Sequence, residues 1–408
     1  MRVALVVQRY GTEVNGGSET HARFVAELLA PHVELTVLTS CALDYVTWAN
    51  HYDPGPTEVN GVPVLRFPVA RPRSAAGFKA ASAAAYAAPG NLQLGRAWMS
   101  AQGPRVPALH EHLEQEHGYD AVAFMTYLYA TTAEGLPRVA GRSVLVPTVH
   151  DEPPLRLRVF DEVFALPRVL IFNTPEEQAL AQRRFGVEPE RARIAGVGVS
   201  EPPASDAERF RRHAGVERPY ALCIGRLDGS KGVPDLLDHH ERYRDACREG
   251  LDLVLVGDGP LRLPRAPWLH TPGFVPEQLK HDALAGAAVV VVPSPYESLS
   301  MAQLEAWSHG RPTLANEVSP VLVGQSRRSG GGLWYAGAGE YAAMLDLLAG
   351  TRPLADAIGA QGRRYVHRAH TWDRVREVWL EALETAAAGA NEFANGGRAA
   401  RPRRAAPP

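Results

Sequence analysis

The sequence has few cysteines and no paired cysteine motif. Its three cysteines, Cys41, Cys223 and Cys247, are scattered over 408 residues without a C-x-x-C pair. Cys41 and Cys223 lie in or beside apolar runs, as small buried residues do. This pattern does not support a disulfide framework, so we expect a protein of the reducing cytoplasm.

Long apolar runs are also missing. The first run, Val3–Val7, is shorter than the about 7–15 residues of a signal peptide, and Leu284–Val292 is shorter than the about 20 of a membrane span. We therefore expect a soluble protein, with at most a weak peripheral association at the inner face of a membrane. The formal net charge of −2 provides no global field that would recruit nucleic acid, and none is expected as a partner.

Two motifs of other enzyme classes are missing as well. The segment GTEVNGGSET after the first strand lacks the G-x-G-x-x-G spacing, which argues against a nicotinamide-dependent enzyme. The sequence has no D-x-D tripeptide and no His, Cys and Asp cluster with metal-ligand spacing. We expect no metal and no bound cofactor.

Short aliphatic runs alternate with helical patterns along the chain, for example a helix expected over 18–30. The expected buried strands are Val3–Val7, Leu35–Thr39, Ala121–Phe124, Ser143–Thr148 and Val169–Asn173, then Tyr220–Ile224, Leu253–Val256 and Val289–Val292. Buried strands with helices between them indicate parallel sheets covered on both faces. Because this alternation of strands and helices starts again near the middle of the chain, we predict an α/β protein with two Rossmann-like halves.

The domain boundary is expected near 196–218, where Gly, Pro and small polar residues suit a linker. This gives an N-terminal domain over 1–200 and a C-terminal domain over 201–369. The Ala/Gly/Pro-rich segment 71–107 is interpreted as a mobile lid or a pair of loosely packed helices. The tail 389–408 has little apolar content, and we expect it to be disordered.

Two cations follow the expected strand Tyr220–Ile224 in the sequence CIGRLDGSKG. Gly225 allows a tight exit from the strand, and Arg226 and Lys231 come next. Ligands of open α/β sheets bind at the carboxyl ends of strands, where two cations can neutralise a pyrophosphate. A solvated basic loop is the structural alternative.

Two carboxylates follow the expected strand Val289–Val292. Glu297 lies in a loop, and Glu305 lies on a helix expected from about Leu299 to His309. The backbone N–H groups of Leu299 and Ser300 open this helix and suit a phosphate, while the carboxylates can accept hydrogen bonds from sugar hydroxyls. Taken singly, Glu297 is also explained as a charge at a helix N-terminus and Glu305 as a solvated residue.

In this order, these stretches resemble the C-terminal donor domain of glycosyltransferase family 4, a retaining family with the GT-B fold. GRLD-x-x-KG resembles the family's Arg/Lys phosphate motif, and Glu297-x7-Glu305 resembles its E-x7-E signature. The segment PGFV, which ends at Val275, resembles the segment that lines the nucleotide base.

The N-terminal half carries the same resemblance. Gly16 and Gly17 resemble the family's Gly-Gly loop, which lets the backbone approach a ligand, and Ser18 is placed to cap the helix that follows. His150 comes just after a strand, where the family often places a His that faces the sugar. The segment 370–388 resembles the family's last helix, which returns to the N-terminal domain.

The resemblance implies a GT-B fold, with two Rossmann-like domains facing across a cleft. It implies a retaining hexosyltransferase that moves a hexose-type sugar from a nucleoside-diphosphate sugar to an acceptor hydroxyl without a metal. The N-terminal domain would bind the acceptor, which the sequence leaves open among glycans, lipid-linked sugars and small metabolites. The reaction would belong to polysaccharide, glycolipid or metabolite glycosylation.

The resemblance also implies a role for each residue. Arg226 and Lys231 would stabilise the departing diphosphate, Glu297 would contact the donor sugar, Glu305 the ribose, and His150 the sugar ring. The remaining residues of the implied donor site are Gly16, Gly17, Gly225, Val275, Leu299 and Ser300.

Two alternatives stay open. A catalytically silent GT-B binding subunit would be expected to lack one of Arg226, Lys231, Glu297 and Glu305, whereas all four are present. A GT-B sugar-phosphate synthase or phosphorylase would share the donor site and differ in its acceptor pocket. The sequence does not identify the base, the sugar or the acceptor.

Overall fold

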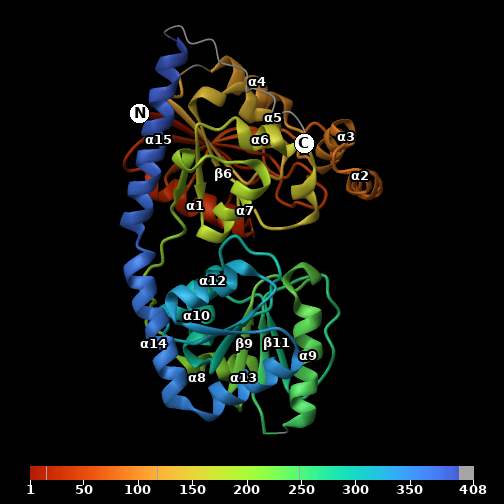
Figure 1. The fold of residues 1–408 in the computed structure, drawn as a ribbon, viewed down its shortest axis with the longest axis vertical. Helices are drawn as coiled ribbons and strands as arrows, with labels where there is room; N and C mark the ends of the chain where they lie inside the picture. The colour runs from red at the N-terminus through yellow and green to blue at the C-terminus, as the bar shows by residue number, and fades with distance from the viewer. Residues whose placement is uncertain (15, 117, 248, 395–408) are drawn as a thin grey trace. The chain divides into compact units, whose positions relative to one another are not determined.

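The structure is a computed structural model that describes residues 1–14, 16–116, 118–247 and 249–394, with side chains described up to residue 389. The chain forms two compact units (Figure 1). Unit 1 contains Met1–Ala195 and the C-terminal segment from Arg376 onward, and unit 2 contains Gly196–Val375.

Unit 1 is built on an eight-stranded sheet in the order β3-β4-β2-β1-β5-β6-β7-β8. Its strands are β1 (Arg2–Val6), β2 (Glu34–Ser40), β3 (Gly55–Val59), β4 (Val62–Phe67), β5 (Ala121–Met125), β6 (Ser143–Val146), β7 (Val169–Phe172) and β8 (Ala192–Ile194). The edge strand β3 pairs antiparallel with β4, and the other neighbouring strands pair parallel. The order reverses between β1 and β5, so the crevice of this sheet lies beyond their carboxyl ends.

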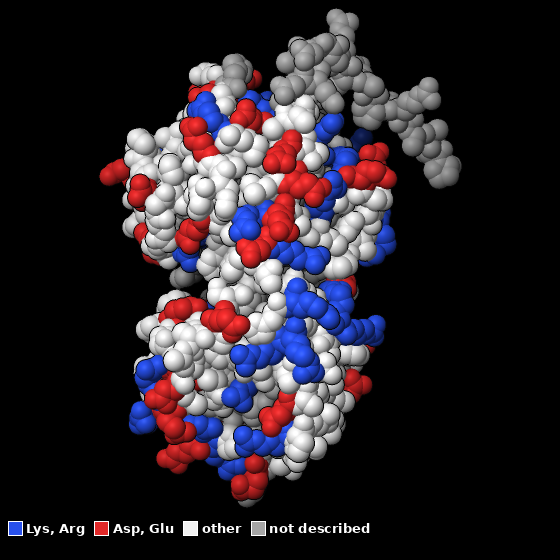
Figure 2. Space-filling view, turned by 90° about the vertical axis from the view of Figure 1, so that its left-hand side faces the viewer, with Lys and Arg blue, Asp and Glu red and all other residues white. Residues whose placement is uncertain are grey.

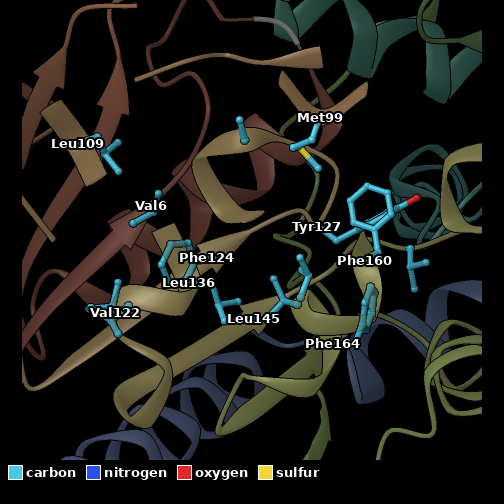
Figure 3. Close-up of a cluster of buried hydrophobic side chains, with 14 of the residues drawn as sticks. Val6, Met99, Leu109, Val122, Phe124, Tyr127, Leu136, Leu145, Phe160 and Phe164 are labelled. Atoms are coloured by element: carbon cyan, nitrogen blue, oxygen red, sulfur yellow. The ribbon is translucent and has the colours of Figure 1, made fainter. Parts of the chain in front are cut away.

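Apolar residues of several helices of unit 1 pack against the buried strands of this sheet. The helices of this unit are α1 (Gly17–Leu29), α2 (Ala75–Ala87), α3 (Leu92–Gln102), α4 (Pro107–Gln115), α5 (Ala130–Gly135), α6 (Phe160–Ala165), α7 (Pro175–Phe185) and α15 (Trp372–Ala394) from Arg376 onward. Figure 3 shows Val122 and Phe124 of β5 in one cluster with Leu109 of α4 and Phe160 of α6. Each such buried side chain contributes roughly 1.5–3 kcal/mol relative to exposure.

The segment 71–107 forms two capped helices, which is one of the two interpretations given above. Ser74 caps α2 and Asn91 caps α3 with their side-chain oxygens. Trp98 of α3 is buried, and its Nε1 donates a hydrogen bond to Ser82 Oγ of α2 at 3.0 Å. Helix α2 buries only Ala85 fully, so it is held mainly through α3.

Unit 2 is built on a six-stranded parallel sheet in the order β11-β10-β9-β12-β13-β14. Its strands are β9 (Tyr220–Ile224), β10 (Asp252–Val256), β11 (Leu269–Gly273), β12 (Val289–Val292), β13 (Thr313–Asn316) and β14 (Gly332–Tyr335). Counted along the chain, this is the 3-2-1-4-5-6 order of doubly wound sheets. The order reverses between β9 and β12, and a ligand is expected at the carboxyl ends of these two strands.

Two apolar cores cover the faces of the second sheet. Ala221 and Cys223 point to the core that contains residues of α9 (Val233–Ala246) and α13 (Ala338–Gly350). Tyr220 and Leu222 point to the core that contains residues of α8 (Ala207–Ala214) and α10 (Glu277–Gly286). The other helices are α11 (Met301–Ser308), α12 (Pro320–Ser329) and α14 (Arg352–Ala369). The predicted α/β architecture with two Rossmann-like halves is confirmed.

The predicted tail needs a correction at its start. Helix α15 continues to Ala394, so residues 389–394 are helical and were wrongly assigned to a disordered tail. Gly389 is buried, and a Cβ there would lie 2.8 Å from Gly141 O, so the missing side chain allows a close approach. The rest of the predicted tail, 395–408, lies outside the described residues.

Charges of both signs cover the surface. Figure 2 shows acidic and basic side chains interspersed on the drawn face, with Lys and Arg also gathered on one part of unit 2. Among the described residues, none of the helices combines the length and the apolar character that a membrane crossing requires.

Candidate functional site

The loop after β9 is held against the end of β10 by backbone contacts. Gly225 N donates a hydrogen bond to Val256 O at 3.0 Å, and Leu227 N donates to Asp258 O at 2.9 Å. A Cβ on Gly257 would lie 1.9 Å from Gly225 O, so this close approach requires glycine. The strand ends therefore place the residues after Gly225 in a fixed position.

Asp228 organises the loop that carries the two predicted cations. It accepts hydrogen bonds from Arg226 Nε, from Ser230 Oγ at 2.7 Å and from Lys231 N at 3.0 Å. Burial raises the pKa of Asp228, but the hydrogen bond from Ser230 and the charge of Arg226 outweigh it, so the pKa is lowered overall. Arg226 Nη2 also donates to Ser230 Oγ at 3.0 Å, so its guanidinium is oriented within the loop.

Lys231 and Glu297 form an ion pair at the point where the sheet order reverses. Lys231 Nζ lies 2.6 Å from Glu297 Oε1, although 66 residues separate them in sequence. Gly232 has a φ of 71°, and a Cβ there would lie 2.3 Å from Pro293 O, so glycine lets the start of α9 approach the end of β12. The structure thus brings together one cation and one carboxylate that the sequence analysis singled out separately.

Glu305 has its own cation partner. It lies on α11, and its Oε1 is 2.8 Å from Lys280 Nζ of α10. Lys280 is also 2.6 Å from Glu277 Oε1. Burial lowers the pKa of Lys280, but Glu305 and Glu277 raise it and outweigh the burial. Lys280 was missed by the sequence analysis because it lies on a different helix, outside every recognised motif.

The start of α11 differs from the prediction in one respect. The helix begins at Met301, with Ser300 as its N-cap, and Ser300 Oγ accepts a hydrogen bond from Gln303 N at 3.3 Å. Ser300 N donates to Gln325 Oε1 at 3.1 Å, so it is not one of the free amides that the sequence analysis assigned to a phosphate. The amides of Met301 and Ala302, in the first turn, have no intrahelical acceptor and are the better candidates. Leu299 is half-buried and packs against the apolar cluster around Trp307.

Val275 lies in the loop after β11, and its side chain belongs to an apolar core of unit 2. A contact with a nucleotide base from this residue would therefore come from its backbone. Its neighbour Phe274 is 71% exposed and presents a large apolar ring at the surface.

The Gly-Gly loop of unit 1 follows β1 and opens α1. A Cβ on Gly16 would lie 2.2 Å from Glu19 Oε2, whereas a Cβ on Gly17 would meet nothing within 4 Å. Glu19 forms a buried ion pair with Arg9, so Gly16 is explained by packing against this pair. The predicted cap by Ser18 is wrong: Gly16 is the N-cap, and Ser18 Oγ donates to Glu19 Oε2 at 2.8 Å.

His150 lies just after β6, near the crevice of the first sheet. Its Nε2 is 3.5 Å from Glu152 Oε1, and the same oxygen accepts a hydrogen bond from Tyr127 OH, after β5, at 2.9 Å. This arrangement places an imidazole, a carboxylate and a phenol at the carboxyl ends of neighbouring strands.

The buried Glu177 of α7 supports this loop. Its carboxylate accepts hydrogen bonds from Val149 N at 2.7 Å and from Asn173 N at 2.6 Å. Burial raises the pKa of Glu177 to about 8, against these amides and the charge of His150, which lower it. Neither Glu152 nor Glu177 was predicted from the sequence, because a carboxylate beside a strand end has no sequence signature of its own.

Among the described residues, no group of three or more His, Cys, Asp or Glu side chains is arranged to hold a metal ion. The residues that could bind an anion in unit 2 are instead Arg226, Lys231 and the first turn of α11.

A family comparison matches the segment of the chain that contains the Lys231–Glu297 pair. Residues 218–348 match the family model described as Glycosyl transferases group 1. This segment lies within unit 2 and contains Arg226, Lys231, Glu297 and Glu305. It is thus similar to a group 1 glycosyltransferase domain.

Curated relatives match parts of the chain. The chain is 28% identical to the MMP alpha-(1->4)-mannosyltransferase of Mycolicibacterium hassiacum, over 50% of this chain and 51% of the relative. It is 27% identical to the D-inositol 3-phosphate glycosyltransferase of Geodermatophilus obscurus, over 68% of this chain and 69% of the relative. The chain thus spans about half the length of the first of these relatives and about two thirds of the second.

Solved structures match nearly the whole chain. HepE from Anabaena, in complex with UDP, superposes with a TM-score of 0.68 at 14% identity, covering 94% of this chain and 100% of that one. Sucrose-phosphate synthase from Thermosynechococcus elongatus gives a TM-score of 0.67 at 18% identity, covering 97% and 100%. The chain therefore has the GT-B fold, as predicted.

Proposed function

We propose that this protein is a glycosyltransferase that transfers a sugar from a nucleoside-diphosphate sugar to an acceptor hydroxyl. The observation that carries this proposal is the Lys231–Glu297 pair at the point where the order of the second sheet reverses. The segment that contains it is similar to group 1 glycosyltransferases. Solved GT-B structures with UDP and with UDP-glucose support a nucleotide-sugar as the donor.

In the proposed reaction, the negative charge that develops on the leaving diphosphate is stabilised by Arg226, Lys231 and the first-turn amides of α11. Such preorganised donors lower the barrier because they need no reorganisation during the reaction. A diphosphate would compete with Glu297 for the ammonium of Lys231, and Glu297 would then accept hydrogen bonds from the donor-sugar hydroxyls. Glu305 would contact the ribose. We propose that these groups support leaving-group departure without a metal and that the anomeric configuration is retained.

Unit 1 is the proposed acceptor-binding part. The exposed part of the His150 imidazole would contact the sugar ring. Glu152 and Tyr127 would fix the position of the loop after β6 that carries His150. The two relatives differ in name, and one is a D-inositol 3-phosphate glycosyltransferase. The acceptor therefore has to be found by experiment.

Ligand-induced stabilisation tests the donor site. A nucleotide at about 100 times its Kd should add about 2.7 kcal/mol to the free energy of unfolding. We expect one of UDP, GDP and ADP to raise the melting temperature of the wild type, and Lys231→Ala to reduce this shift. Lys79→Ala, which changes an exposed lysine of α2, is the matched control and should keep the full shift. No shift with any of the three nucleotides would refute the proposal.

The same panel separates the alternatives. A silent binding subunit would be stabilised by a nucleotide but would not release nucleoside diphosphate from any nucleotide-sugar. A sugar-phosphate synthase or phosphorylase would require a sugar phosphate or inorganic phosphate as the second substrate. Turnover with an unphosphorylated acceptor therefore distinguishes the proposed activity from both.

A further inference from the structure

Unit 1 contains a pocket of about 540 Å³ beside the edge hairpin of its sheet. The walls come from the loop after β1, the loop after β2, strand β3, and Arg66 on β4. Its size lies within the roughly 300–1,000 Å³ of small-molecule sites. The proposed donor site includes none of these residues.

Arg66 is the buried charge in the wall of this pocket. It is 5% exposed, and its Nη1 has no hydrogen-bond acceptor among the described residues. Its guanidinium carbon lies 3.8 Å from the centroid of the Tyr52 ring, so a cation–π contact fixes its orientation. A buried donor without an acceptor is costly in a folded protein, and a ligand oxygen in the pocket would satisfy it.

The other charged residues in the wall are carboxylates. Glu13, Asp53 and Glu58 are exposed and line the same pocket. The backbone N–H of Glu13 itself and the nearby hydroxyl of Tyr52 lower the pKa of the Glu13 carboxyl, so it remains an ionised acceptor.

One cation and three carboxylates give the wall an excess of negative charge. This excess disfavours a phosphate or carboxylate ligand, because like charges repel. A hydroxylated ring without charge fits better, because each hydroxyl can donate to a carboxylate and accept from the guanidinium.

We propose that this pocket binds an uncharged sugar or cyclitol ring of the acceptor, with Arg66 donating to a hydroxyl oxygen and Glu13 accepting from a hydroxyl. The assignment of this ring to the acceptor rests on the proposed function. The binding itself does not, because every residue of the pocket lies within unit 1.

Saturation-transfer NMR on the full-length protein tests the pocket. The probes are methyl α-glucoside, methyl α-mannoside, methyl α-galactoside and myo-inositol, with glucose 6-phosphate as the charged comparison. We expect at least one uncharged probe to receive saturation and to bind more tightly than glucose 6-phosphate. Loss of one hydrogen bond to a charged group should weaken its binding about tenfold in Arg66→Gln and in Glu13→Gln.

Glu188→Gln, an exposed carboxylate of unit 1 outside the pocket, is the matched control and should bind the probe as the wild type does. If Arg66→Gln does not fold, the binding of the probe by Glu13→Gln, a change at an exposed residue, tests the proposal by itself. The proposal is overturned if none of the four uncharged probes binds, if Glu13→Gln binds as the wild type does, or if glucose 6-phosphate binds most tightly. The shift in melting temperature caused by a nucleotide, measured on the same samples, tests the proposed donor site separately.

Discussion

Lys231 Nζ lies 2.6 Å from Glu297 Oε1, and the two residues follow β9 and β12, the neighbouring strands at which the sheet order of unit 2 reverses. Doubly wound sheets bind ligands at this position because the crossover helices leave on opposite faces there and a crevice opens between the strands. Both members of this ion pair can change partner when a donor binds. A diphosphate can replace the Glu297 carboxylate as the partner of Lys231, and a sugar hydroxyl can replace the Lys231 ammonium as the partner of Glu297. The pair therefore links the fold directly to the proposed donor chemistry.

The glycine at the end of β10 should be essential for the shape of this crevice. Gly257→Ala would place a Cβ 1.9 Å from Gly225 O at a φ of 139°, so strain and overpacking combine. We expect a loss of about 2–4 kcal/mol in the free energy of unfolding, measured by urea denaturation. Gly337→Ala is the control, because a Cβ there meets nothing within 4 Å. Equal stability of the two variants would contradict the packing described for the loop after β9.

The carboxylate of Glu305 should act on donor binding more than on turnover. Glu305→Gln removes the proposed ribose acceptor and leaves Lys280 paired with Glu277. We expect KM for the nucleotide-sugar to rise about tenfold with kcat little changed, since a ribose contact is the same in the ground and transition states. Steady-state kinetics measures both constants, with the exposed Glu317→Gln as control. A fall in kcat at unchanged KM would assign Glu305 a different role.

The imidazole of His150 should act on transfer and not on nucleotide binding. His150→Asn removes the proposed contact with the sugar ring, and the nucleotide-binding residues of unit 2 are unchanged. We expect kcat to fall about tenfold, the effect of one lost hydrogen bond, while the thermal shift caused by the nucleotide is retained. A wild-type kcat in the His150→Asn variant would show that His150 does not take part in sugar transfer.

Acid should destabilise unit 2 through His240. This side chain is buried between Tyr341 OH at 2.8 Å and Leu251 O at 3.1 Å, and burial lowers its pKa to about 4. The unfolded pKa is about 6.5, so the folded state binds fewer protons. The stabilisation from His240 is complete above about pH 6.5 and is lost as the pH falls toward 4.

The size of this effect is about 1–3 kcal/mol over that interval. We expect urea unfolding to show a shallower decline between pH 6.5 and 4 in His240→Gln than in the wild type. His309 shares the depressed pKa, so part of the wild-type slope should remain in the variant. Identical slopes in the two proteins would show that His240 is not kept neutral by the fold.

The strands that the sequence predicted are those buried on both faces. β5, β9 and β12 are continuous apolar runs with buried residues at nearly every position, so composition alone indicates a buried strand. β3 and β11, whose residues are mostly half-buried or exposed and include proline, were missed. The strands β4, β8, β13 and β14 were not predicted either. The β3–β4 turn at Asn60–Gly61, with positive φ at both residues, was a signal that could have been used.

The residues proposed for the site come from motifs, whereas their side-chain partners from elsewhere in the chain were not predicted. Arg226, Lys231, Glu297 and Glu305 follow from spacing and resemblance. The partner Lys280 does not, because side-chain pairing across helices depends on packing that local pattern does not encode. The cap at Ser18 was wrong for the same reason, since the hydroxyl bonds to Glu19, which the distant Arg9 holds in place.

The most direct test of the donor site is the rate at which nucleoside diphosphate is released from the nucleotide-sugar in Lys231→Ala and Glu297→Gln. Loss of one group that stabilises developing charge should slow release about 100- to 1,000-fold. We predict slowing of this order in Lys231→Ala, a clear loss in Glu297→Gln, and wild-type melting temperatures without nucleotide in both. Two folded variants that release nucleoside diphosphate at the wild-type rate would contradict the proposed donor site.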